Sequence, residues 1–116
     1  MTDDLRILRK RTRAPAYPAQ EEWSFWCPGC KCGHAFVVKW DPGLAEKMRE
    51  DKLGTPTWTF NGDQAKPTFG PSLLYREEYE GKVQRVCHLY VKAGQIEFLG
   101  DCTHEFSGKT VPMEPF

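Results

Sequence analysis

The chain contains a Cys-Pro-Gly-Cys turn at residues 27–30, and Cys32 and His34 follow at once. A Cys-x-x-Cys turn brings two thiolates to one side of the backbone, where they can bind a single tetrahedral metal ion. The sequence has five cysteines, an odd number that pairing into disulfides would not use up. We therefore interpret Cys27 and Cys30 as half of a metal site that constrains the fold.

The composition places limits on the class of protein. A chain of 116 residues is long enough for one domain with a thin hydrophobic core. Its 16 basic side chains balance 16 acidic ones, which makes nucleic acid and membrane surfaces poor partners. No apolar run approaches the roughly 20 residues of a membrane span, and no signal peptide is visible. We expect a cytoplasmic protein, where clustered cysteines indicate metal binding or catalytic thiols rather than disulfides.

Short strand-like segments, separated by glycine and proline, make up most of the pattern. A helix is expected only over residues 44–52, ending at Gly54. The prolines of the tract 67–71 predict an irregular loop. The predicted fold is mostly β: a small single-domain antiparallel sheet or barrel-like fold with a zinc knuckle and at most one or two short helices. The expected strands are residues 23–26, 35–40, 57–60, 72–75, 83–91 and 96–99.

Two regions are expected along the chain. Residues 1–22 are basic and contain prolines, which predicts a solvated or loosely docked N-terminal arm; a contact for phosphate or an acidic partner is the alternative. Residues 23–116 are expected to form the zinc-binding β domain.

The second half of the metal site must come from the C-terminal third. Cys87 and His88 are neighbours on an expected strand, so their side chains point to opposite faces and only one of them can face the ion. Cys102 and His104 are two residues apart, so both can face it in an extended segment. We expect zinc, the usual metal of a closed Cys/His site, held by four of five candidates: Cys27, Cys30, Cys87, Cys102 and His104.

Other uses of the cysteines compete with this interpretation. A thioredoxin-like redox pair requires a helix directly after Cys30, and the sequence shows none. A catalytic zinc with three protein ligands and a water would need a general base, for which Glu105 and Asp101 are available. A single cysteine, taken alone, is usually a small buried side chain.

Several motifs together resemble one family. They are Cys27–Cys30 with His34, the segments 58–63 and 67–72, Cys87-His88 followed by Gly94-x-Ile96, and the segment 99–104 with 108–111. This family consists of small phage and bacterial proteins of unassigned function, some of which carry an automatic and physically implausible label of ammonia monooxygenase. The resemblance covers about residues 23–112. The sequence departs from the family pattern at Gly70, where a second serine is expected.

The resemblance implies a function. Some relatives lie beside bacterial ubiquitin-like conjugation genes and are thought to be zinc-containing peptidases of the serine type, which implies catalytic roles for Ser72 and His88. A serine nucleophile needs a base within hydrogen-bond reach and a third group that orients the base. His88 can be that base if it faces away from the metal, and Asp63 or Asp101 can orient it.

The alternative function is non-enzymatic: a zinc-stabilised protein-interaction module, for example a phage protein that binds a host factor. Either function makes a protein partner or protein substrate the expected ligand. In the second case exposed aromatic side chains would form the contact, although burial in the core is the more common fate of such residues. They are Trp58, Phe60, Phe69 and Tyr75.

Overall fold

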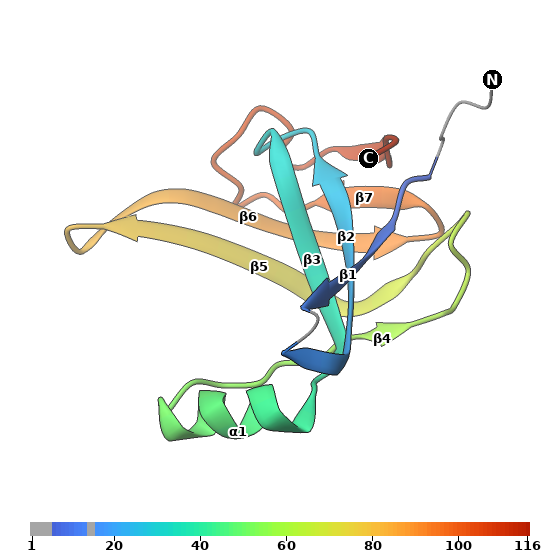
Figure 1. The fold of residues 1–116 in the computed structure, drawn as a ribbon. Helices are drawn as coiled ribbons and strands as arrows, with labels where there is room; N and C mark the ends of the chain where they lie inside the picture. The colour runs from blue at the N-terminus through green and yellow to red at the C-terminus, as the bar shows by residue number, and fades with distance from the viewer. Residues whose placement is uncertain (1–5, 14–15) are drawn as a thin grey trace.

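The structure is a computed structural model that describes residues 6–13 and 16–116. Its described part is mostly β, as the sequence predicts, with one helix and two antiparallel sheets. Figure 1 shows the strands of the first sheet crossing steeply over β5 and β6 of the second. The three-stranded sheet has the order β1 (Arg9–Arg13), β2 (Tyr17–Cys27), β3 (Cys32–Lys39). The five-stranded sheet has the order β4 (Thr59–Phe60), β5 (Phe69–Tyr79), β6 (Lys82–Lys92), β7 (Gln95–Phe98), β8 (Thr110–Pro112).

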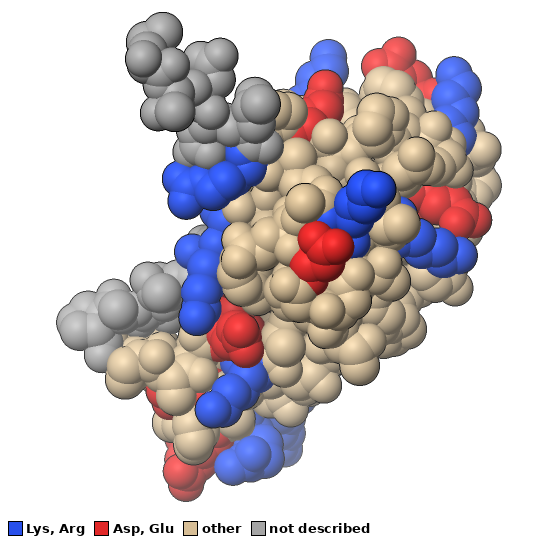
Figure 2. All heavy atoms as spheres, turned by 90° about the vertical axis from the view of Figure 1, so that its right-hand side faces the viewer, with Lys and Arg blue, Asp and Glu red and all other residues tan. Residues whose placement is uncertain are grey.

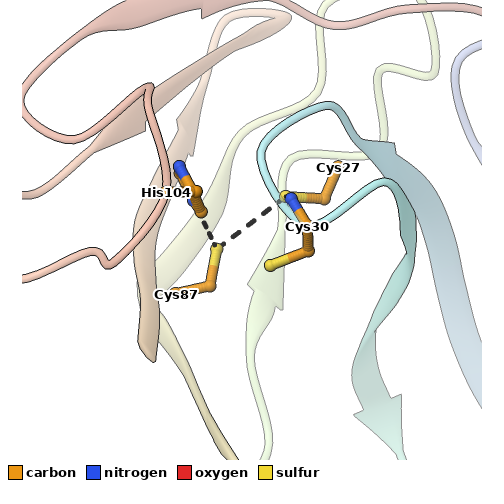
Figure 3. A group of neighbouring side chains, drawn as sticks. All are labelled: Cys27, Cys30, Cys87 and His104. Atoms are coloured by element: carbon orange, nitrogen blue, oxygen red, sulfur yellow. Dashed lines mark hydrogen bonds between the residues drawn. The ribbon is translucent and has the colours of Figure 1, made fainter. Parts of the chain in front are cut away.

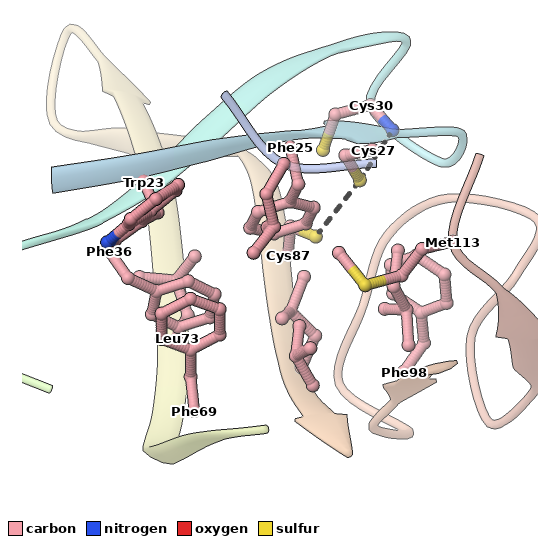
Figure 4. Close-up of a cluster of buried hydrophobic side chains, with 14 of the residues drawn as sticks. Trp23, Phe25, Cys27, Cys30, Phe36, Phe69, Leu73, Cys87, Phe98 and Met113 are labelled. Carbon is pink, nitrogen blue, oxygen red and sulfur yellow. Dashed lines mark hydrogen bonds between the residues drawn. The ribbon is translucent and has the colours of Figure 1, made fainter. Parts of the chain in front are cut away.

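The core lies between the two sheets and is largely aromatic. Phe25 and Phe36 enter it from the first sheet and Phe69 from the second, and all three are almost fully buried. The rings of Phe36 and Phe69 stack with their centroids 4.3 Å apart. Each such side chain contributes roughly 1.5–3 kcal/mol by leaving water. Figure 4 shows that this cluster continues without a break to Cys27 and Cys87, so the metal-ligand candidates are part of the core.

The part of the N-terminal arm that the structure describes belongs to the first sheet. β1 and the first six residues of β2 precede the boundary expected after residue 22, which therefore falls inside β2. Asp41, the N-cap of helix α1 (Pro42–Glu50), accepts a hydrogen bond from the backbone N–H of Ala19 and donates its own to the Gln20 side chain. β2 is thus fastened to the helix. Residues 1–5, 14 and 15 of the expected arm lie outside the described residues.

β5 begins earlier than expected, and its first residues are irregular. The tract 67–71, predicted as a loop, runs into β5 at Phe69. The pairing of β5 with β6 is irregular between Phe69 and Leu73, where the register shifts. The Gly70–Pro71 peptide bond in this stretch is cis. Ser72 lies within this stretch. Helix α1 is too short and too polar to cross a membrane, and no other helix occurs in the described ranges.

Candidate metal centre and serine site

Four potential ligands converge at one end of the core. The Sγ atoms of Cys27, Cys30 and Cys87 and a ring nitrogen of His104 all lie within 4.8 Å of one another. Figure 3 shows Cys27 at the end of β2, Cys30 on the turn between β2 and β3, Cys87 on β6 and His104 on the loop between β7 and β8, all pointing toward one another. The three cysteines are buried, and His104 is partly buried. Three sulfur atoms and one imidazole form a donor set that suits a tetrahedral metal ion.

The knuckle, residues 27–30, has a tight backbone turn. The N–H of Lys31 donates to the Cys27 carbonyl at 2.8 Å, and the N–H of Cys30 points at the Cys27 Sγ at 3.4 Å. Gly29 lets the turn approach the second half of the site, because a Cβ there would overlap the imidazole of His104. The Phe106 N–H donates to His104 Nδ1, so Nε2 is the nitrogen that faces Cys87, at 3.4 Å from its Sγ.

The protonation of the thiols shows which charge the cluster favours in a ligand. A hydrogen bond from Cys87 is the largest of the effects that lower the pKa of Cys27 to about 4. Burial and then the Cys27 charge raise the pKa of Cys30 to about 11, and the same hydrogen bond and burial raise the pKa of Cys87. The cluster alone therefore holds one negative charge at neutral pH. A divalent cation would make three thiolates favourable, so the donor set fits a metal ion.

The remaining candidates lie outside this cluster. Cys102, the fifth of the proposed ligands, places its Sγ 3.2 Å from both the N–H and the carbonyl oxygen of His88. His34 is buried and packs against the rings of Phe25 and Tyr75. Cys32 pairs with Cys27 across the first sheet and is partly exposed.

On the opposite face of β6, Ser72, His88 and Asp101 form a connected row. The Ser72 Oγ lies 3.1 Å from His88 Nε2, and the Asp101 Oδ2 lies 3.0 Å from His88 Nδ1. Ser72 is partly exposed, and the side chains of His88 and Asp101 are 26% and 54% exposed. The sequence left Asp63 and Asp101 open as the third member. The structure brings Asp101 to His88, whereas Asp63 accepts hydrogen bonds from the N–H groups of Ala65 and Lys66 in its own turn.

Strand alternation explains why two sites occur side by side. Cys87 and His88 point to opposite faces of β6, as the sequence predicts. His88 pairs with Leu74 on β5, so Ser72, two residues earlier, is its diagonal neighbour on the same face. The segment after β7 then follows the other edge of β6: Leu99 donates to the His88 carbonyl, and Thr103 to that of Val86. This segment carries Asp101 to one site and His104 to the other.

The row has the connectivity of an acid–base relay. Because a carboxylate only accepts hydrogen bonds, Asp101 favours the tautomer with the proton on Nδ1, which leaves Nε2 free to accept from the Ser72 hydroxyl. Two contacts that sequence reasoning did not foresee hold the row in place. The Trp58 indole N–H donates to the Ser72 carbonyl at 3.1 Å, and Cys102 bridges the backbone of His88. No sequence motif signals either contact.

The fold and the cluster together define a small β protein with a largely buried donor set of three cysteines and one histidine that fits a metal ion, and comparison with known families makes this class more specific. A family model described as "bacterial ubiquitination-like system serine protease (BubE)" matches residues 4–99. The chain belongs to this family, which agrees with the resemblance seen in the sequence. Neither the curated proteins nor the solved structures contain a match.

Proposed function

We propose that this chain is a serine protease with Ser72 as nucleophile, His88 as general base and Asp101 as the residue that orients His88. The observation that carries the proposal is the row of two hydrogen bonds, at 3.1 and 3.0 Å, on the open face of β6. The family description, which calls its members serine proteases, supports it independently.

The chemistry follows from the positions of the protons. The Ser72 Oγ attacks the carbonyl carbon of a peptide bond while His88 Nε2 accepts the hydroxyl proton, and His88 then gives that proton to the leaving amine. Water, deprotonated by the same nitrogen, releases the acyl group from Ser72. Asp101 keeps its charge throughout and stabilises the imidazolium.

We propose that the Cys27, Cys30, Cys87 and His104 cluster holds a zinc ion whose role is structural. Four protein ligands fill a tetrahedral shell and leave no position for substrate or water. The ion cross-links the knuckle, β6 and the loop after β7, and so fixes the segment that carries Asp101 against His88. This arrangement favours the structural role over a catalytic zinc.

The substrate we propose is a protein, because the family description places its members in a ubiquitination-like system. The surface also fits such a partner better than nucleic acid. Figure 2 shows one side of the molecule, on which acidic and basic side chains are interspersed around a broad area of other residues, in line with the balanced charge of the chain.

Labelling with a small fluorophosphonate tests the serine mechanism. The probe phosphonylates an activated serine and releases fluoride. We expect one adduct, located by mass spectrometry on the peptide that contains Ser72, and none in Ser72→Ala. Ser24→Ala is the matched control, since Ser24 is a buried serine whose hydroxyl donates to the Arg9 carbonyl, and it should label like the wild type. A folded, metal-loaded wild type without an adduct would contradict the mechanism and favour a non-enzymatic interaction module.

A further inference from the structure

The edge of β5 beside Ser72 carries backbone groups without a strand partner. β4 pairs with β5 only at Gly70 and Phe69, although β5 continues to Tyr79. Beyond β4, the Trp58 indole contacts the Ser72 carbonyl from the same side. Among the described residues, no strand pairs with this edge after Ser72.

The register shows which groups point outward from this edge. In an antiparallel strand the N–H and C=O of one residue point to the same side, and consecutive residues alternate. The backbone N–H and C=O groups of Val86 and His88 point away from β5, because they form hydrogen bonds on the other edge of β6. Their partners there are Thr103, Leu99 and Cys102. On β5, Val86 and His88 pair with Arg76 and Leu74. The N–H and C=O groups of these two residues therefore face outward, and we call them the open edge.

The open edge differs from the outer half of the same hairpin. Exposed strand edges are commonly protected by charged side chains and by bulges. The outer half, from Glu77 onward, has both: the charged Glu78, which forms an ion pair with Arg76 at the boundary, and a register shift between Glu77 and Glu78. Next to Ser72, in contrast, the edge carries Leu74, a residue that is 54% exposed and whose side chain lies on the same face as the serine two positions away.

We propose that the open edge binds an extended segment of the protein substrate as an added β-strand, through the N–H and C=O groups of Leu74 and Arg76, and thereby presents its scissile bond to Ser72. The inference rests on the proposed function, because a substrate segment is chosen as the occupant on the ground that the open edge lies on the same strand as the nucleophile Ser72. Strand addition uses main-chain hydrogen bonds for affinity and side-chain contacts for selectivity. Leu74 supplies the apolar contact.

Amide hydrogen exchange of two covalent adducts tests the inference. One adduct carries the small fluorophosphonate on Ser72. The other carries a tetrapeptidyl phosphonate, selected by its labelling of Ser72 from a mixture in which each of the four amino acids is varied. In the free protein and the small adduct we expect fast exchange at Leu74 and Arg76, and slow exchange at Leu73 and Tyr75, which face β6. The peptidyl adduct should slow Leu74 and Arg76 by about ten-fold or more. Equal exchange of these two amides in both adducts would overturn the inference.

The ratio of the labelling rates of the two probes gives a second measurement that does not depend on a natural substrate. Leu74→Pro removes an N–H that faces outward, a change that edge strands tolerate. We expect the ratio of peptidyl to small-probe labelling to fall by about ten-fold in Leu74→Pro, and by less in Leu74→Ala, which keeps the N–H. An unchanged ratio in Leu74→Pro would also overturn the inference. If neither probe labels Ser72 in the wild type, the proposed function itself fails, which is a different outcome.

Discussion

Both faces of β6 carry a cluster of reactive side chains, but one cluster is buried and the other is partly exposed. On one face Cys87 is fully buried in a cluster of four potential metal ligands. On the other, His88 is a quarter exposed and lies between a serine and a half-exposed carboxylate. Burial makes the first face suited to a bound cation and to stability, because uncompensated thiolates there are costly. Exposure makes the second suited to proton transfer with a substrate.

Of the substitutions that test the difference between the two faces, Cys87→Ser should have the largest effect on metal binding and stability. It removes one of four ligands, so metal binding should be lost and the free energy of unfolding should fall by more than about 5 kcal/mol. Thermal unfolding with elemental analysis measures both. Cys32→Ser, outside the cluster, should keep the metal and the unfolding temperature. A Cys87→Ser protein that binds metal as tightly as the wild type would remove Cys87 from the site.

Asp101→Asn separates the orienting residue from the metal site. The Asn amide can donate to Nδ1, which favours the tautomer with the proton on Nε2, where it can no longer accept from Ser72. We expect labelling of Ser72 to slow by about 10⁴-fold, with metal content unchanged. Asp63→Asn is the matched control and should label normally, since its oxygen still accepts the turn hydrogen bonds. Equal loss in both variants would point to a general effect of charge.

The pH dependence of metal affinity tests the account of the thiols. Free Cys27 is ionised at neutral pH, while Cys30, with a pKa of about 11, and Cys87, with a raised pKa, are protonated. Binding as three thiolates therefore releases two protons from the thiols, so affinity should rise with pH, by about 100-fold per unit around neutral pH. Competition with a chromophoric chelator at pH 6.5 and 7.5 measures the slope. An affinity independent of pH would show that these thiols do not lose protons on binding.

Cys102→Ala should have the smallest effect. Its Sγ contacts both backbone groups of His88, so its loss should relax the position of the base and reduce the rate of labelling about three- to ten-fold, at a cost of about 1 kcal/mol in stability. Cys102→Ser, whose hydroxyl can make both contacts, should recover most of the rate. Loss of metal in Cys102→Ala would instead place this thiol in the metal shell.

The sequence predicts the knuckle, the hairpin of β6 and β7 and the opposite orientation of Cys87 and His88, because these depend on local patterns. It does not select the fourth ligand. Both Cys102 and His104 would face the ion in an extended segment, but hydrogen bonds from Cys102 to Leu99 and from Ser107 to His104 turn the chain there. β1 was also missed, since RKRTR has no apolar alternation and its pairing is decided by β2.

Metal content and fluorophosphonate labelling of His88→Ala, measured on the same sample, test the central claim most directly. Because His88 lies on the opposite face of β6 from the cluster, we expect this variant to keep about one metal ion per chain, as a closed four-ligand site requires, and to unfold like the wild type. Its Ser72 should not be labelled. Loss of the metal together with the labelling would place His88 in the metal shell and contradict the separation of the two sites.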